Sequence, residues 1–207
     1  MNTPHAHDSA ATPKQPRTER GRQTLRKLLD AAAVEFGEKG FHDASITGIT
    51  ARAGTALGTF YTYFDSKDEV FRALVHDLSD RVRVTVGGAL AGEMSAIETE
   101  ERALSSFLSF ARAHKEIYRI IDEAEFVDAQ SYRSHYESTA KRIFERLTAG
   151  AENGEFRDDL TEAHAWAIMG MNVFLGLKYS IWSSEGSAEE IAAAARSMLE
   201  HGIKRGG

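Results

Sequence analysis

The stretch GFHDASITGITARAGTALGTFYTYFDSKDE, from Gly40 to Glu69, decides how this chain folds. Within it, Ile46, Ile49 and Ala53 recur at the spacing of one apolar helix face, which predicts a short helix. Gly54 then occupies the position where a helix ends in a left-handed residue, a conformation that costs glycine least. The first half of the stretch therefore predicts a short helix that stops in a tight turn.

A second short helix follows this turn and opens at Thr55 or Ala56. Two helices that cross over a short turn containing glycine form the helix-turn-helix arrangement. Ser66, with Glu69 three residues later, forms a capping box and predicts that a further helix begins there. The large apolar and aromatic residues of the second short helix are Leu57, Phe60, Tyr61 and Phe64.

Composition restricts the class of protein. With 42% apolar and 27% charged residues, the chain has an ordinary soluble composition, and its 207 residues suffice for one large helical domain or two small ones. The absence of cysteine excludes disulfides and thiolate metal sites and fits a reducing cytoplasm. No apolar signal segment opens the chain, and the longest apolar run, from Trp166 to Leu177, is too short to span a bilayer. We therefore expect a cytoplasmic protein that does not enter a membrane.

The net charge of −6 is unevenly distributed. Residues 1–72 hold ten Lys or Arg and nine Asp or Glu, hence +1, whereas residues 73–207 hold fifteen and twenty-two, hence −7. Residues 14–30 alone hold six basic and two acidic residues, hence +4. Because phosphate attraction is screened over about 10 Å, binding DNA needs a local basic face rather than a basic protein. The charge permits a nucleic-acid partner without showing one.

Residues 1–17 contain all three prolines and no periodic apolar pattern, which predicts a disordered arm with a basic end. His5 and His7 are expected to belong to this tail rather than to a metal site. The first helix is predicted from Thr18 to Lys39. Basic residues near its start oppose the helix dipole, so they either contact a phosphate backbone or form a solvated face. They are Arg20, Arg22, Arg26 and Lys27.

Periodic apolar residues continue along the chain and no segment alternates with a period of two, so we predict an all-α fold of about nine helices. Caps are expected at Thr99, at Asp128, at Asp159 with Glu162 and at Ser187 with Glu190, and helix stops at Gly40, Gly87, Gly88, Gly92 and Asn153-Gly154. The later helices are expected from Lys67 into the mid-eighties, Thr99 to about His114, Glu116 to Glu125, Ala129 to about Asn153, Asp159 through Ile181, and Ala188 to about Ile203.

From Gly40 to Val70 the sequence resembles the TetR family of bacterial transcriptional regulators. Two departures lie where the second short helix starts. The family often has Val-Ser where this chain has Thr55-Ala56, and a polar or basic residue where it has Leu57. Thr55 is expected to take over the capping role, and both changes bear on the preferred DNA sequence rather than on whether DNA is bound. The matching residues are Phe36, Gly40-Phe41, Ile49, Ala53-Gly54, Gly58-Thr59, Phe60-Tyr61, Tyr63-Phe64 and Lys67.

The resemblance implies an N-terminal three-helix DNA-binding domain over residues 18–65, with the helix-turn-helix. A C-terminal helical ligand-binding and dimerisation domain is implied over residues 66–207. The implied function is that of a repressor released from a palindromic double-stranded DNA operator by a small, largely apolar effector. Because one reading helix recognises few base pairs, a homodimer is expected. Its interface would use the last two helices, including the apolar segment from Trp166 to Trp182 with Gly170 and Gly176.

The family pattern also implies which residues contact DNA. The second short helix is expected to enter a major groove, while Ser45, Thr47 and Lys67 contact the phosphate backbone. Phe60 and Phe64 are instead expected in the core. The residues of the second helix and its ends that are expected to contact bases or backbone are Ala56, Leu57, Gly58, Thr59, Tyr61, Thr62 and Tyr63.

The middle helices are expected to enclose a mostly apolar ligand cavity, although core packing is the commoner role for each side chain taken separately. Ligand binding would stabilise a tilt of the helix that begins at Lys67 and so change the spacing of the two reading helices. The residues expected to line the cavity are Phe107, Phe110, Tyr118, Ile121, Phe126, Tyr136, Trp166, Met169 and Phe174.

Two other classes of protein compete with this interpretation. One is a DNA-binding regulator without a small ligand, and the other is a helical ligand-binding protein or enzyme. An enzyme needs convergent titratable residues, and the available ones show no metal-ligand spacing such as His-Glu-x-x-His. We therefore expect no enzymatic activity, no cofactor and no metal. The residues considered are His114, Glu123, Glu125, His135 and His164.

Overall fold

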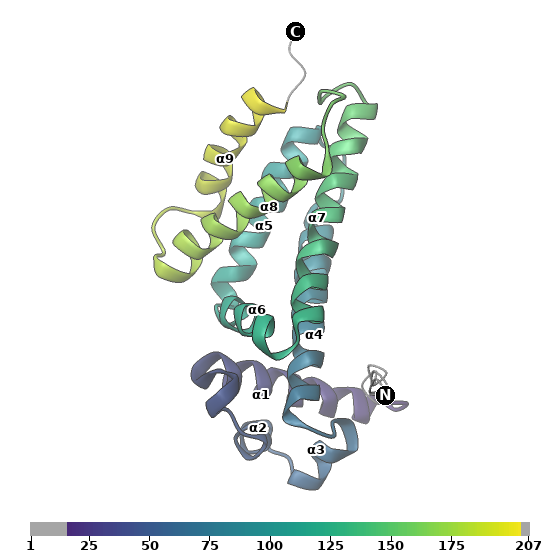
Figure 1. Cartoon of the computed structure of the whole chain (residues 1–207), viewed down its shortest axis with the longest axis vertical. Coiled ribbons are helices and arrows are strands. Elements are labelled where there is room, and N and C mark those ends of the chain that lie inside the picture. The colour runs from purple at the N-terminus through teal and green to yellow at the C-terminus, as the bar shows by residue number, and fades with distance from the viewer. Residues whose placement is uncertain (1–15, 204–207) are drawn as a thin grey trace, which may run out of the picture.

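The computed structural model describes residues 16–203, and every regular element in that range is a helix (Figure 1). The all-α prediction is confirmed for those residues. Most of the predicted arm, including His5 and His7, lies outside the described residues. The elements are α1 (Glu19–Asp43), α2 (Ile46–Ala53), α3 (Leu57–Tyr63), α4 (Lys67–Ala89), α5 (Ala96–Ala113), α6 (Glu116–Val127), α7 (Ala129–Glu152), α8 (Glu162–Gly176), the π-helix η1 (Leu177–Trp182) and α9 (Ala188–Gly202).

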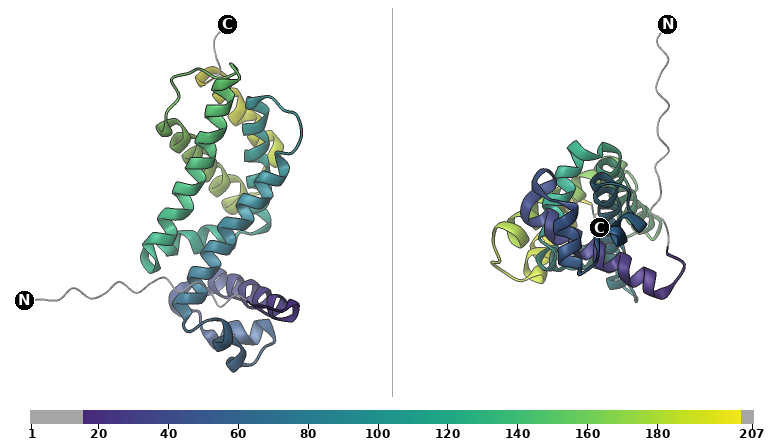
Figure 2. Two further views of the ribbon diagram at one scale, coloured as in Figure 1. Left: turned by 90° about the vertical axis from the view of Figure 1, so that its right-hand side faces the viewer. Right: turned by 90° about the horizontal axis from the view of Figure 1, so that it is seen from below.

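Helices α1 to α3 form the lower end of the molecule in Figure 1, and α4 runs from them into an upper body completed by α5 to α9. The left view in Figure 2 shows the same division. One cluster of buried residues nevertheless crosses it, since Phe36 and Phe60 belong to the same cluster as Phe71 of α4 and Ile120 of α6. Because close-packed interiors transmit strain, a movement of α4 or α6 acts directly on the helix-turn-helix unit.

Two glycines shape the lower end. Gly54 adopts φ 63° and ψ 37°, the left-handed conformation predicted for the turn between α2 and α3. Gly40 adopts φ 80° and ψ 169°, which interrupts α1 near its end and confirms the expected break. Residues with a Cβ rarely adopt a positive φ. Ser45 and Ser66 cap the helices that follow, α2 and α4, by accepting backbone N–H groups.

The start of α3 differs from the prediction. Ala56 rather than Thr55 is the N-cap residue, and it makes no side-chain cap. The Thr55 hydroxyl is buried and finds no hydrogen-bond partner among the described residues. The expected capping by Thr55 is therefore wrong. Helix α3 is held by the packing of its buried side chain, Phe60, and not by a capped end.

Two boundaries in the middle of the chain also differ. Helix α5 begins after Ser95, which forms a capping box with Glu98. Thr99, the expected cap, lies one turn inside and donates its hydroxyl to the Ser95 carbonyl at 2.9 Å. Helix α4 continues through Gly87 and Gly88, because a glycine costs a helix only about 1 kcal/mol and the packing of α4 outweighs that.

The apolar segment near the C-terminus begins and ends differently from the prediction. Helix α8 follows Thr161, whose N–H donates to His164 Nδ1 at 3.0 Å, and Asp159 is not its cap. At Gly176 the α-helix gives way to the π-helix η1. A Cβ at Gly176 would overlap the Tyr118 hydroxyl, so this glycine permits the close approach of α6. No helix within residues 16–203 combines the length and apolarity needed to cross a bilayer.

Candidate nucleic-acid interface and ligand cavity

Helix α3 presents an exposed face at the lower tip of the molecule (Figure 1). Leu57 is 45% exposed and Tyr61 47%, so both large side chains are available to a partner. Phe60 and Phe64 are completely buried, which confirms that they are core residues. Of the other residues expected to contact DNA on this helix, Ala56, Gly58 and Thr62 are exposed and Thr59 and Tyr63 are half-buried.

The start of α2 supplies two hydroxyls. The Ser45 hydroxyl accepts from the Gly48 N–H at 3.0 Å and lies 3.1 Å from the Thr47 hydroxyl. Thr47 is exposed, whereas Ser45 is half-buried. The capping role of Ser45 is intrahelical, so Thr47 is the better placed of the two for a contact outside the protein.

A buried carboxylate fixes α2 against α1. Glu35 is completely buried and accepts hydrogen bonds from Lys39 at 2.7 Å, Arg52 at 2.7 Å and the Ser45 N–H at 3.4 Å. Burial raises the pKa of Glu35, but these hydrogen bonds lower it by more, so the pKa lies below its ordinary value. Gly48 lies so close that a Cβ there would overlap the carboxylate. The position of α2 therefore depends on this ionised group.

Lys67, which is expected to contact a phosphate, has an internal role. Its Nζ donates to the carbonyls of Phe41 at 2.7 Å, His42 at 3.0 Å and Ala44 at 3.0 Å. An ammonium group has three donors, and all three are engaged. Lys67 thus holds the end of α1 against the start of α4. A phosphate contact by Lys67 would require the ammonium to leave these carbonyls.

The basic start of α1 is only partly available to a partner. Arg26 forms hydrogen bonds of 2.6 and 2.9 Å to both carboxylate oxygens of Asp77 on α4, so it joins two helices. Arg22 pairs with a neighbour on its own helix. Arg20 and Lys27 are exposed and have no carboxylate within 4.0 Å in the part of the chain that the structure describes. These two residues are the cations best placed to meet a phosphate backbone.

A cavity of about 540 Å³ lies in the upper body among α4, α5, α6, α7 and α8. Its size falls within the ~300–1,000 Å³ of typical small-molecule pockets. Most of its lining is apolar. The expected ligand residues that do line it are Phe107, Tyr118, Ile121, Tyr136 and Met169. Their contact with a ligand stays a prediction.

Four expected ligand residues do not line this cavity. Phe110 is buried in the core, with its ring centre 4.6 Å from that of His114. Phe126, Trp166 and Phe174 are 86%, 40% and 71% exposed and lie on the outer surface. Helix α8 is apolar around much of its circumference, so its sequence could not tell the inner face from the outer one.

Sequence reasoning missed the polar side of the cavity. Helix α7 contributes His135, Thr139, Arg142 and Arg146 to the lining, and α4 contributes Arg83. The four residues of α7 follow one another at intervals of four, three and four, which places them on one helix face. This spacing could have identified them from the sequence, because polar residues along one face of a helix indicate that the face contacts either solvent or a ligand.

Burial keeps several of these groups neutral. His135 Nδ1 lies 2.7 Å from the Ser79 hydroxyl, and burial, with a smaller effect of Arg142, lowers the pKa of His135 to about 4. Burial also raises the pKa of the Tyr118 hydroxyl, which donates to the Val173 carbonyl at 2.7 Å. The cavity therefore offers a neutral imidazole and phenol beside cationic guanidinium groups at neutral pH.

Helix α6 contacts both the cavity and the lower end of the molecule, and lies directly above α1 in Figure 1. Tyr118 and Ile121 line the cavity. Arg119 donates to two carbonyls near the end of α1 at 3.2 and 3.0 Å. Glu123 accepts from the Phe41 N–H, just after the Gly40 break, at 2.6 Å. One helix therefore connects the walls of the cavity to the helix that supports α2.

Comparison with known proteins agrees with this architecture. The chain is 28% identical over 189 residues to YdgC, an uncharacterized HTH-type transcriptional regulator of Bacillus subtilis (strain 168), covering 89% of this chain and 94% of that protein. It is 26% identical over 187 residues to the HTH-type transcriptional repressor KstR2 of Rhodococcus jostii (strain RHA1), covering 86% and 88%.

Among solved structures, the fatty acid degradation regulator FadR from Bacillus halodurans superposes with a TM-score of 0.75 at 19% identity, covering 89% of this chain and 96% of that one. FadR from Bacillus subtilis, solved in complex with stearoyl-CoA, gives a TM-score of 0.74 at 18% identity, covering 86% and 98%. A family model described as bacterial regulatory proteins, tetR family, matches residues 28–74, which include α2 and α3. Residues 28–74 therefore carry the DNA-binding domain of the TetR family of transcriptional regulators.

Proposed function

We propose that this protein is a repressor that binds a palindromic operator as a homodimer and leaves it when a small, largely apolar effector enters the cavity. The observation that carries the proposal is that α6 lines the cavity with Tyr118 and Ile121 while Arg119 and Glu123 hold the end of α1. Because the proposed partner is operator DNA, we also propose that the protein works in the cytoplasm.

The reading surface in this proposal is the exposed face of α3. Leu57 and Tyr61 would contact base edges, with an apolar side chain suited to a thymine methyl and a phenol able to donate or accept a hydrogen bond. Within residues 16–203, no atom beyond the local helix backbone lies within 4 Å of the position that a Cβ would take at Gly58, so the helix there can approach a partner closely. Arg20, Lys27 and Thr47 would contact phosphates and fix the register.

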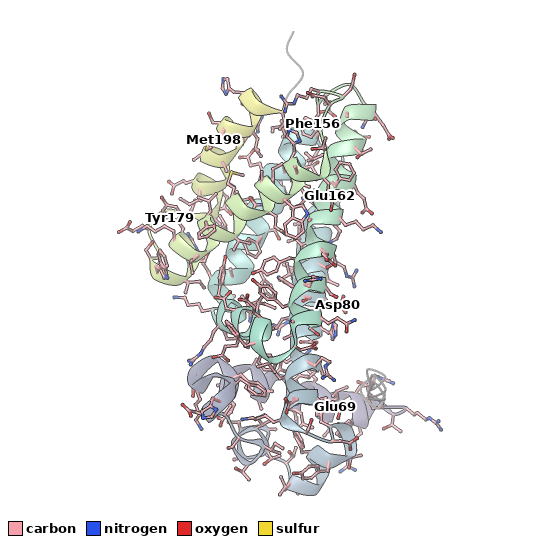
Figure 3. All side chains as sticks on the ribbon, viewed as in Figure 1. Glu69, Asp80, Phe156, Glu162, Tyr179 and Met198 are labelled. Atoms are coloured by element: carbon pink, nitrogen blue, oxygen red, sulfur yellow. The ribbon has the colours of Figure 1, made fainter. Side chains whose placement is uncertain are left out.

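Exposed apolar side chains on α8, η1 and α9 support the homodimer. Phe174, Trp182 and Met198 are each at least 70% exposed, and Trp166 is 40% exposed. Met198, labelled in Figure 3, lies on the outer side of the upper body. Exposed aromatic and Met side chains on adjacent helices are typical of protein interfaces. Gly170, between Trp166 and Phe174 on the same face, leaves room for a second helix.

An effector is supported by the cavity itself and by the relatives. Burying a ligand in about 540 Å³ among Phe107, Ile121 and Met169 would displace α6 or α4 by small amounts. A ligand shifts the operator equilibrium only through its different affinities for the two conformations. The FadR structure with stearoyl-CoA, a neighbour in fold, holds a ligand with a long apolar chain. That neighbour makes an acyl compound a reasonable first candidate.

Gel retardation on the DNA upstream of the gene tests the DNA-binding part. We expect a retarded band that weakens at least tenfold in Tyr61→Ala, because an exposed side chain of the reading face is lost without disturbing the core. The matched control is Phe126→Ala, which removes an exposed aromatic residue far from α3 and should leave retardation unchanged. No retardation by the unaltered protein at low salt would overturn the proposal.

The effector part is tested by extracting the purified protein with organic solvent and identifying the released compounds by mass spectrometry. A compound that binds to the protein and abolishes retardation supports a ligand-responsive repressor. If compounds that bind in the cavity leave retardation unchanged, the second candidate, a DNA-binding regulator without a small-molecule ligand, replaces it.

A further inference from the structure

Three arginines line one side of the cavity. Arg83 comes from α4, and Arg142 and Arg146 come from α7. Arg83 lies about one helical turn after Asp80, the α4 residue that is labelled in Figure 3. The rest of that side includes the apolar residues Val82, Val86 and Ile143 and the exposed carboxylate of Glu145. The cavity is therefore polarised, with a cationic edge between α4 and α7.

Two of the three arginines have carboxylate partners. Arg146 forms hydrogen bonds of 2.6 and 2.9 Å to both oxygens of Glu100, which is almost completely buried. The exposed Arg83 pairs with Asp80 at 3.1 Å. The bidentate pair leaves Arg146 little charge to offer a ligand, whereas Arg83 makes a single exposed ion pair, which solvent weakens.

Arg142 is different. Its hydrogen bond is to a neutral group, the Thr139 hydroxyl, at 3.0 Å. Within residues 16–203 no carboxylate lies within 4.0 Å of its guanidinium. Asp80 and Glu145 attract it from a longer distance. Arg142 is half-buried in the lining, so it is the cation of this edge that an anion entering the cavity would meet unpaired.

A half-buried guanidinium without a carboxylate is an unfavourable arrangement in the unliganded protein. Burial lowers the pKa of Arg142, and repulsion from Arg83 and Arg146 adds to this effect. An anion bound there would remove both penalties, because charge-assisted bidentate bonds to a guanidinium are among the strongest in proteins. Such a site favours an anion over a neutral group of the same size.

We propose that the effector is an amphiphile whose anionic headgroup, a carboxylate or a phosphate, pairs with Arg142 while its apolar chain lies among Phe107, Ile121 and Met169. This inference rests on the proposed function, in which the cavity is the effector site. It adds the chemical class of the effector and the residue that selects it.

Two carboxylates also line the cavity. Glu145 of α7 is exposed, so solvent screens its charge. Asp122 of α6, with Glu125 nearby, is the alternative anchor for a ligand. Burial and the charge of Glu125 raise the pKa of Asp122, so its carboxyl holds its charge less firmly than an ordinary aspartate. Asp122 is also exposed to solvent, which screens it, whereas Arg142 is half-buried. The balance therefore favours an anion at Arg142 over a cation at Asp122.

Calorimetric titration of the full-length protein with five ten-carbon probes distinguishes an anion site, a cation site and a site without charge preference. The probes are decanoate, decyl phosphate, 1-decanol, decanamide and decyltrimethylammonium. We expect at least one of the two anions to bind at least tenfold more tightly than the neutral alcohol and amide. Decanoate and decyl phosphate distinguish a carboxylate source of the anion from a phosphate source.

Three variants locate the site. Arg142→Met keeps an apolar stem of similar length and should weaken the anionic probe about tenfold to a hundredfold while changing 1-decanol less than about twofold. Arg142→Lys restores the charge and should recover part of the loss. Lys141→Gln is the matched control, because it removes one charge from the neighbouring, 76% exposed side chain of the same helix. Thermal unfolding of each variant verifies that it is folded.

The outcomes are distinct. Equal binding of anionic and neutral probes, or tightest binding of decyltrimethylammonium, overturns the anion site but leaves the cavity as an effector site. An anion preference that persists in folded Arg142→Met overturns the assignment to Arg142. If no probe of any charge binds, this inference fails, whereas the proposed effector function is decided by the extraction experiment above. A tenfold or larger loss confined to the anionic probes in Arg142→Met supports it.

Discussion

Two glycines in neighbouring short helices of the lower end have opposite surroundings. A Cβ at Gly48 would overlap the Glu35 carboxylate, whereas one at Gly58 would meet nothing within 4 Å beyond its own helix backbone in the described part of the chain. Gly48→Ala should therefore cost about 1–3 kcal/mol of unfolding free energy through overpacking. Gly58→Ala should leave stability unchanged or slightly raised. Urea unfolding of the two variants measures this difference.

The same pair separates folding from DNA binding. If the bare backbone at Gly58 lies against DNA, Gly58→Ala should weaken gel retardation although the protein is as stable as before. Equal stability of the two variants would contradict the close packing at Gly48. Unchanged retardation in Gly58→Ala would remove Gly58 from the reading surface.

Glu35 should make the DNA-binding end sensitive to acid. Its pKa in the folded protein lies below the ordinary 4.5, because hydrogen bonds from Lys39, Arg52 and the Ser45 N–H outweigh the effect of burial. A lowered folded-state pKa gives stability that is present above the unfolded-state value and is lost as the pH falls through the folded-state value. The free energy of unfolding should therefore decrease as the pH falls below about 4.5, and this decrease should be less steep in Glu35→Gln.

The measurement for Glu35 is urea unfolding at a series of pH values from about 6 down to about 3. Glu137→Gln, a change at an exposed carboxylate on α7, is the control and should keep the acid slope of the unaltered protein. An identical slope in Glu35→Gln would mean that other carboxylates cause the acid loss.

At the scale of elements, α6 is the proposed connection between ligand and DNA. The Glu123 carboxylate accepts from the Phe41 N–H, and a side chain at Gly40 would collide with Arg119 and Glu123. Glu123→Ala should leave ligand affinity within about twofold but raise the ligand concentration needed for operator release about tenfold, a coupling loss of about 1.4 kcal/mol.

The test compares ligand titrations by calorimetry with ligand titrations of gel retardation. Glu137→Ala is the control, because it removes an exposed carboxylate of α7 that neither lines the cavity nor bonds to α1 among the described residues. Equal shifts in both titrations for Glu123→Ala would show that Glu123 affects binding of the ligand and not its coupling to DNA.

At the scale of the whole molecule, the exposed apolar side chains on α8, η1 and α9 should decide the oligomeric state. Phe174→Asp places a charge on a side chain that is 71% exposed, so the single chain should fold normally while a dimer that buries this side chain dissociates. Sedimentation velocity should give a monomer, and operator affinity should fall because two linked reading heads act with a high effective concentration.

Phe126→Asp is the control for this prediction, since Phe126 is 86% exposed and lies at the end of α6, away from α8. It should sediment as the unaltered protein does. A dimer that survives Phe174→Asp would place the interface elsewhere on the surface.

The sequence alone determined the DNA-binding end, because its signals are local. A glycine at the left-handed turn, serine caps and an apolar period act within a few residues, and each appears where it was predicted at Gly54, Ser66 and Phe60. The same locality explains the errors at Thr55 and Thr99. At the start of α3, Thr55 competes with Ala56 for the N-cap position, and at the start of α5, Thr99 competes with Ser95. Because the competing residues are close neighbours, small differences in packing decide which one becomes the N-cap.

Only the tertiary structure decided what the charged and apolar side chains of the helices face. Lys67 and Arg26 have the sequence signature of phosphate contacts, yet carbonyls of α1 and Asp77 of α4 engage them. Phe174 and Met169 lie on one apolar helix, yet one is outside and the other lines the cavity. Such assignments depend on which distant helix packs on which face. The helical periodicity of the sequence shows which residues share a face but not which other helix covers that face.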